Sequence, residues 1–175
     1  LAGKALVVVD EAYVEFCGRA SLTARLAEFP NLVILRTLSK AYALAGARLG
    51  TAIASEEIIG LLRRIIPPYA IPASTVDEVM ALTEAPQRAL SAARIRTLLD
   101  ERSRMRDRLE RCANVARVFP SDANFLLVEC RDAGQFFAAG KSAGLIVRDF
   151  SSYPGLANCL RISIGTPEQN ERLLA

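Results

Sequence analysis

The chain has 175 residues, 51% of them hydrophobic and 23% charged, with a formal net charge of +3 and no histidine. This globular composition allows one or two small cores, and so small a charge gives no argument for a nucleic-acid partner. Without histidine, a hydrolase triad with an imidazole base is excluded. No apolar run is long enough to span a membrane and no signal peptide is present, so we expect a cytoplasmic protein with no membrane partner.

The first predicted element is a buried parallel strand over Leu6–Val9, because the run is short and β-branched. It ends in Asp10-Glu-Ala-Tyr13. Ligands of open α/β sheets bind beyond the carboxyl ends of strands, so Asp10 is placed to pair with a protonated ring nitrogen. Tyr13 is placed to hydrogen-bond a ring oxygen. The alternative for Asp10 is a helix N-cap or turn residue.

The next segments are a helix over Leu22–Phe29, ended by Pro30, and a buried strand over Asn31–Arg36. The strand leads into a loop of small residues that carries Lys40, one of only three lysines. Apolar neighbours would lower the pKa of this amine and make it a nucleophile toward carbonyl carbon. The alternative is a strand-loop-strand whose lysine reaches out to water.

An anion site is predicted in the same loop. Arg48 lies between Gly46 and Gly50, which permit sharp turns and close approach of a ligand, and its guanidinium can fork onto a phosphate. Ser39 adds a hydroxyl donor for the same anion.

The middle of the chain is predicted to be mainly helical. Tyr69 is interpreted as a packing residue in the loop that precedes a helix capped by Ser74, and Pro86 begins a long charged helix, about 86–112, that links two domains. The other predicted elements here are a strand over Leu49–Ala54 and an amphipathic helix over Glu56–Ile66, stopped by Pro67 and Pro68.

The last part of the chain is predicted to be a small α+β domain. Its expected strands are 115–119, 124–129, 145–147 and 159–164, with helices over 132–142 and at the C-terminal end. Alternation along 159–164 points Arg161 away from the apolar face, where an anionic partner would meet it. The alternative is a solvent-facing charge on an edge strand. The four cysteines, without C-x-x-C spacing, are interpreted as reduced core residues that bind no metal: Cys17, Cys112, Cys130 and Cys159.

Three segments resemble the fold-type I enzymes that use pyridoxal 5'-phosphate, and most closely the histidinol-phosphate aminotransferase family. They are Val-Asp-Glu-Ala-Tyr-Val-Glu-Phe at 9–16, Thr-Leu-Ser-Lys-Ala-Tyr-Ala-Leu-Ala-Gly-Ala-Arg-Leu-Gly at 37–50, and Pro-Gly-Leu-Ala-Asn-Cys-Leu-Arg-Ile-Ser-Ile-Gly-Thr at 154–166. One departure is Tyr42, where a phenylalanine is common. The resemblance implies an α/β fold: residues 1–90 complete a mostly parallel large-domain sheet, and 91–175 form the small α+β domain.

The resemblance also implies the roles of the site residues. Asp10 would bind the pyridinium nitrogen and Tyr13 the ring hydroxyl, Lys40 would form the Schiff base, and Ser39 and Arg48 would hold the cofactor phosphate. Two further arginines, Arg161 and Arg148, would bind the anionic group of the substrate.

The implied activity is transfer of an amino group from histidinol phosphate to 2-oxoglutarate by a homodimer in histidine biosynthesis. Two other enzyme activities remain open, a threonine-phosphate decarboxylase and an aromatic or broad-range aminotransferase. Because the family's chains are about twice as long, we also expect this sequence to lack an N-terminal half. A further alternative, of another class, is that the chain as it stands is a non-catalytic fragment that acts only as an association module.

Overall fold

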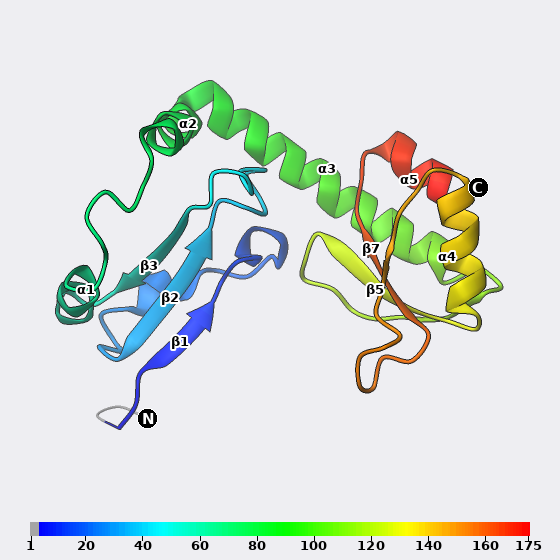
Figure 1. Cartoon of the computed structure of the whole chain (residues 1–175), viewed down its shortest axis with the longest axis horizontal. Coiled ribbons are helices and arrows are strands. Elements are labelled where there is room, and N and C mark those ends of the chain that lie inside the picture. The colour runs from blue at the N-terminus through cyan, green and yellow to red at the C-terminus, as the bar shows by residue number, and fades with distance from the viewer. Residues whose placement is uncertain (1–3) are drawn as a thin grey trace. The chain divides into compact units, whose positions relative to one another are not determined.

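The computed structural model describes residues 4–175 (Figure 1). The chain divides into an N-terminal unit, Leu1–Ala92, and a C-terminal unit, Ala93–Ala175, and the division falls within the long helix α3, Ala85–Leu109. Each unit has its own sheet.

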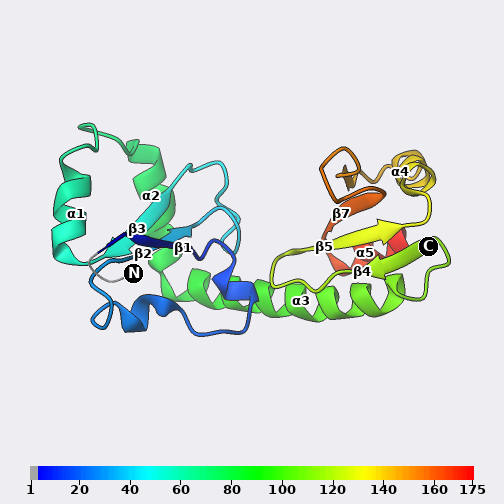
Figure 2. The ribbon, with the colours of Figure 1, turned by 90° about the horizontal axis from the view of Figure 1, so that it is seen from below.

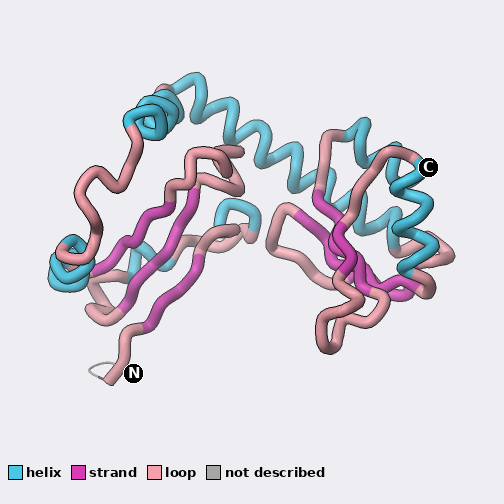
Figure 3. Tube along the Cα trace, in the orientation of Figure 1, coloured by secondary structure: helices cyan, strands magenta, loops and turns pink. Residues whose placement is uncertain are grey.

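The sheet of the N-terminal unit has three strands in the order β1-β2-β3, with bounds Val7–Asp10, Leu32–Thr37 and Gly50–Ala54. Strand β1 runs parallel to β2, whereas β3 runs antiparallel to it. Strand β2 lies between two neighbours, which explains why its apolar run Leu32-Val33-Ile34 is buried. Figure 3 shows that the loops after β1 and β2 leave the same end of this sheet.

The helices of the N-terminal unit are α1, Glu56–Arg63, and α2, Ala73–Thr83, with 3-10 turns η1, Val14–Phe16, and η2, Leu22–Arg25. The helix expected over Leu22–Phe29 is wrong: Ser21 and Glu11 bind the backbone N–H groups of Thr23 and Leu22, which closes only a short turn. The cap prediction for Ser74 is also wrong, because Pro72 takes that position.

Tyr69 does not pack: its side chain is 100% exposed and its φ is 56°. The prediction that it is a packing residue is therefore wrong in this chain.

The sheet of the C-terminal unit is antiparallel, in the order β4-β5-β7-β6, with bounds Val115–Val118, Phe125–Cys130, Cys159–Ser163 and Arg148–Asp149. The strand expected over 145–147 is wrong, because pairing with β7 begins only at Arg148. Strand β7 has neighbours on both sides, so Arg161 does not lie on an edge strand.

One face of this sheet forms the core of the C-terminal unit. The alternating residues Leu126 and Val128 of β5, with Leu160 and Ile162 of β7, are at most 1% exposed and pack on Met105 of α3. Helices α4, Ala133–Ser142, and α5, Pro167–Leu174, complete this layer (Figure 2).

Both short helices of this unit begin at side-chain caps. Asp132 accepts a hydrogen bond from Gln135 N, and Thr166 forms a capping box with Gln169. Within the described residues, no helix has the length and apolar character needed to cross a membrane.

Candidate functional site

The five predicted cofactor residues all belong to the N-terminal unit: Asp10 ends β1, and the other four lie on the two loops that follow β1 and β2. We refer to residues 11–16 as the β1 loop and to residues 38–49 as the lysine loop. Asp10 ends β1 and pairs in register with Leu35 of β2, so both loops start at one sheet edge. This is the edge at which open α/β sheets bind ligands.

Asp10 is exposed at this edge, and its Oδ1 accepts a hydrogen bond from Ala12 N at 2.9 Å. This hydrogen bond is the one that a turn residue makes, so the alternative interpretation of Asp10 as a turn residue agrees with the structure. That bond uses one carboxylate oxygen. The hydrogen bond closes a turn at the start of the β1 loop, three residues before Tyr13.

The Lys40 amine lies over the ring of Tyr13, with Nζ 5.5 Å from the ring centroid. This contact joins the two loops directly and attracts the ammonium group to the ring face. Lys40 is exposed. The apolar enclosure expected from its neighbours in sequence is therefore absent from this chain, because those side chains do not cover the amine.

The lysine loop is held at both ends. The Ser39 N–H donates to Thr37 Oγ1 at 3.1 Å, and the Thr37 hydroxyl lies 2.9 Å from Ser39 Oγ. Near the far end, Ala47 O accepts a hydrogen bond from the buried hydroxyl of Thr75 on α2 at 3.2 Å. Ser39 is thus oriented before any ligand binds.

Backbone strain in this loop lies at non-glycine residues. Ala43 and Arg48 have φ values of 57° and 53°, in the left-handed region that costs such residues energy. Gly46 lies in a turn, as expected, which the hydrogen bond from Ala47 N to Leu44 O closes, whereas Gly50 begins β3 and lies in no turn. Neither glycine has a positive φ. Arg48 is exposed and donates from Nη1 to Ala45 O at 3.0 Å.

An ion-pair network behind the two loops was not found from the sequence. Arg36 of β2 donates from Nη2 to Glu15 Oε1 at 2.9 Å, and its Nε lies 3.8 Å from Glu11 Oε2. Glu11 is 8% exposed and also accepts hydrogen bonds from Ser21 Oγ and Leu22 N. The sequence indicated this network only through three charged residues near the ends of β1 and β2, namely Glu11, Glu15 and Arg36. Which of them pair could be known only from the register of the strands.

Tyr42 belongs to the same network. It lines a cavity of about 170 Å³ together with Glu15 and Arg36. Burial raises the pKa of the Tyr42 phenol, and the charge and hydrogen bond of Glu15 raise it further against the opposing charge of Arg36. The family departure noted in the sequence thus adds a hydroxyl that reaches the β1 loop.

In the C-terminal unit, Arg148 of β6 and Arg161 of β7 are direct cross-strand partners. Arg161 lies on the sheet face opposite the core, as its alternation predicts, beside Leu127. Like charges placed opposite each other destabilise a sheet unless an anion lies between them.

Aromatic rings hold the two guanidinium groups. Cζ of Arg161 lies 5.2 Å from the ring centroid of Phe125 and 5.6 Å from that of Phe150, and Cζ of Arg148 lies 5.3 Å from that of Phe150. Nε of Arg161 is buried without a hydrogen-bond partner among the described residues. A buried donor without a partner favours an oxygen acceptor at this place.

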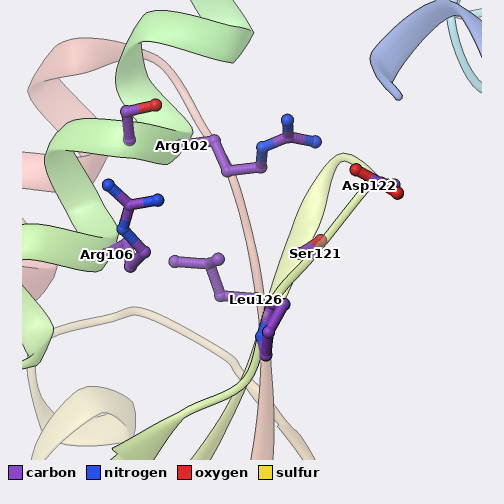
Figure 4. A pocket seen from close by; sticks show the side chains of 7 residues that line it. Arg102, Arg106, Ser121, Asp122 and Leu126 are labelled. Atoms are coloured by element: carbon purple, nitrogen blue, oxygen red, sulfur yellow. The ribbon is translucent and has the colours of Figure 1, made fainter. Parts of the chain in front are cut away.

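A separate pocket of about 340 Å³ lies between α3 and the β4–β5 loop (Figure 4). Arg102 and Arg106 extend into it from α3, but Arg102 already donates to Ala123 O and Arg106 to Asp107. None of the predicted site residues lines this pocket. It opens on the core side of the sheet, away from the face of Arg161.

The model of the family described as aminotransferase class I and II matches residues 2–175, almost the whole chain. The chain belongs to this family. As an aminotransferase of class I and II it has the fold-type I architecture, of which the two units form part.

Curated relatives agree with this assignment. The histidinol-phosphate aminotransferase of Xanthomonas campestris pv. campestris (strain B100) is 48% identical over 174 residues, which are 99% of this chain and 48% of the relative. That of Xylella fastidiosa (strain Temecula1 / ATCC 700964) is 47% identical over 100% of this chain and 48% of its own length. This aminotransferase chain therefore spans about half the length of the curated relatives it matches.

Solved structures agree on the fold. The histidinol-phosphate aminotransferase of Clostridium acetobutylicum superposes with a TM-score of 0.83 at 23% identity, over 97% of this chain and 52% of that one. The L-threonine-O-3-phosphate decarboxylase of Porphyromonas gingivalis superposes with a TM-score of 0.82 at 24% identity, over 95% of this chain and 52% of that one. At such identities the likeness shows the fold alone. The histidinol-phosphate aminotransferase of Sinorhizobium meliloti, solved in complex with pyridoxal-5'-phosphate, superposes with a TM-score of 0.79 at 26% identity, over 97% of this chain and 46% of that one.

Proposed function

We propose that this chain is part of a pyridoxal-phosphate-dependent aminotransferase whose substrates are histidinol phosphate and 2-oxoglutarate. The observation that carries the proposal is the meeting of the β1 loop and the lysine loop, with Lys40 Nζ 5.5 Å above the ring of Tyr13. The relatives of nearly half identity are named for this activity.

The side chains at this edge match the chemical groups of the cofactor. A carboxylate, Asp10, suits a pyridinium nitrogen, and the phenol of Tyr13 suits the ring hydroxyl. The hydroxyl of Ser39 and the guanidinium of Arg48 suit a phosphate, with Arg48 held in a strained backbone conformation typical of functional sites. Lys40 supplies the amine that meets the aldehyde.

When bound, pyridoxal phosphate supplies an electron sink for negative charge at the substrate α carbon. Asp10 holds the proton on the ring nitrogen, which keeps that sink effective. The Lys40 amine acts as a base that takes the proton from the substrate α carbon and later returns one. Ser39 and Arg48 keep the cofactor from shifting during this transfer.

We further propose that Arg161 and Arg148 bind the phosphate of histidinol phosphate, and a carboxylate of glutamate in the other half of the reaction. The unpartnered Nε of Arg161 and the cross-strand pairing of the two arginines support this role. A threonine-phosphate substrate would present the same anion. A panel of histidinol phosphate, threonine phosphate and aromatic amino acids, tested on the longer protein, separates these activities.

The cofactor assignment is tested by absorbance of the purified chain with added pyridoxal phosphate, followed by borohydride reduction and peptide mapping. We expect a visible band that borohydride removes and a pyridoxyl mass on Lys40, both absent from Lys40→Ala. Labelling spread evenly over Lys4, Lys40 and Lys141 would overturn the assignment.

We also propose that the longer protein is a cytoplasmic homodimer. Large apolar side chains exposed on the N-terminal unit, such as Ile65 and Ile71, support a further interface. Light scattering of the longer protein tests this, and a monomer would contradict it. A fragment that acts only by association would self-associate without labelling Lys40.

A further inference from the structure

We propose that Glu15 and Tyr42 are positioning residues, which tie the β1 loop to the lysine loop and so set the approach of Lys40 to Tyr13. Nothing in the family resemblance assigns them a role. Their role rests on the proposed function, in which Tyr13 and Lys40 hold one cofactor.

The spacing of the residues supports the inference. Glu15 follows Tyr13 by two residues on the β1 loop, and Tyr42 follows Lys40 by two residues on the lysine loop. Glu15 and Tyr42 line one cavity of about 170 Å³, so we infer a contact between them one step behind the contact of Lys40 with Tyr13. The effect of Glu15 on the pKa of the Tyr42 phenol agrees with this contact. Two contacts between the same loops fix their separation better than one contact does.

Arg36 anchors this contact to the sheet. It belongs to β2, and its Nη2 donates to Glu15 at 2.9 Å, so the carboxylate that meets Tyr42 is held by a strand residue. Both partners are largely shielded from water, with side chains 14% exposed for Glu15 and 32% for Arg36. A charge-assisted hydrogen bond in such surroundings orients the carboxylate more firmly than a surface pair would.

The arrangement matters because Lys40 itself is exposed and has a long, flexible side chain. The position of its amine therefore depends on the position of the loop that carries it. Without the contact of Glu15 with Tyr42, the lysine loop would keep its anchors at Thr37 and Thr75 but would be linked to the β1 loop only through Lys40 itself.

The test reads the position of Lys40 without cofactor. With three lysines in the chain, ¹³C labelling of the lysine ε carbons gives three resolvable NMR signals, and Lys40→Arg assigns one of them. Because Lys40 Nζ lies over the face of the Tyr13 ring, we expect the ring current to shift the ε-methylene protons of Lys40 upfield of those of the other two lysines. We expect Glu15→Gln and Tyr42→Phe each to lower the population of the close arrangement about threefold, the effect of one net hydrogen bond.

The controls separate position from folding. Glu57→Gln changes an exposed carboxylate on α1 and leaves the Lys40 signal in place. Tyr42→Phe keeps the aromatic ring, so its cavity stays filled. The double variant shows no more than the larger single effect, because both changes break one contact. Two results would overturn the inference. One is a double variant whose fold-change equals the product of the two single fold-changes, and the other is an unmoved Lys40 signal in either folded variant.

The same samples distinguish this inference from the proposed function. If the Lys40 signal moves in the variants but pyridoxal phosphate does not label Lys40 of the unmodified chain, the positioning role stands and the cofactor assignment fails. If pyridoxal phosphate labels Lys40 but the Lys40 signal does not move in the variants, the cofactor assignment stands and the positioning role fails.

Discussion

Replacing Arg161 by methionine tests whether the arginine pair of the C-terminal unit is an anion site. Methionine keeps the length and the contact with the rings of Phe125 and Phe150 but removes the charge and the unpartnered Nε. A residue kept for stability should be costly to replace. A residue kept for an anion should cost little without that anion.

The magnitude follows from three opposing contributions. The two contacts of the guanidinium with aromatic rings contribute about 1–2 kcal/mol in total, which the variant loses in part. Relief of a buried donor without a partner returns about 1–3 kcal/mol. Both guanidinium groups lie within 5.6 Å of the Phe150 centroid, so their charges are at most about 11 Å apart and repel by roughly 0.4–1.5 kcal/mol. We expect Arg161→Met to be more stable than the unmodified chain by about 1 kcal/mol.

The assay is urea denaturation followed by circular dichroism, with and without inorganic phosphate at constant ionic strength. Phosphate at ten times its dissociation constant should raise the free energy of unfolding of the unmodified chain by about 1.4 kcal/mol and leave Arg161→Met unchanged. Arg117→Met is the matched control. Arg117 also stacks on a ring, that of Phe119, but its cross-strand partner is Glu129 rather than an arginine.

Two results would refute the reasoning. A loss of more than about 1 kcal/mol in Arg161→Met without phosphate would mean that the arginine stabilises the sheet. An equal phosphate response in Arg161→Met and in the unmodified chain would place the bound anion elsewhere.

Three further predictions concern other parts of the chain. Arg48→Gly relieves a positive φ, so we expect up to about 1 kcal/mol of added stability in urea together with weaker pyridoxyl labelling of Lys40. Glu101→Gln should cost about 1–3 kcal/mol at pH 7, because this buried carboxylate accepts hydrogen bonds from Arg104 and Asn170. The hydrogen bond from Arg104 lowers the pKa of Glu101 below 4.5, so this stabilisation is present above pH 4.5 and lost as the pH falls through the lowered value; urea titrations of both chains should converge there. Burial raises the pKa of the Cys130 thiol to about 11, so iodoacetamide at pH 8 should modify the half-buried Cys17 and Cys112 before Cys130, as peptide mapping would show.

The sequence predicted those features that depend on local pattern. The apolar runs gave the strands β1, β2, β5 and β7 within one or two residues, and alternation placed Arg161 on the face away from the core. Elements that depend on single contacts were missed. The segment after Ser21 has helical spacing but forms a 3-10 turn. The reason is that Glu11, 11 residues before Leu22 in the sequence, accepts a hydrogen bond from the N–H of Leu22, and the spacing of apolar residues does not indicate this contact.

The same limit explains the errors in the candidate site. Apolar neighbours in sequence gave no information about the exposure of Lys40, since the loop directs those side chains elsewhere. The glycines did not indicate which residues have a positive φ, because the structure has Ala43 and Arg48 in the left-handed region instead. The pairing of Arg36 with Glu15 depends on strand register, which brings together residues 21 positions apart.

The proposed cofactor residues and the proposed substrate arginines lie in different units, which makes their tests independent. Pyridoxyl labelling reports on Lys40 and its loop in the N-terminal unit, and the phosphate response reports on Arg161 and Arg148 in the C-terminal unit. If each site is built by its own sheet, Lys40→Ala should keep the full phosphate response and Arg161→Met should keep the labelling, because each variant changes a residue of one unit only. Loss of both responses in either variant would show that one change disturbs the whole chain, and neither result could then be assigned to a site.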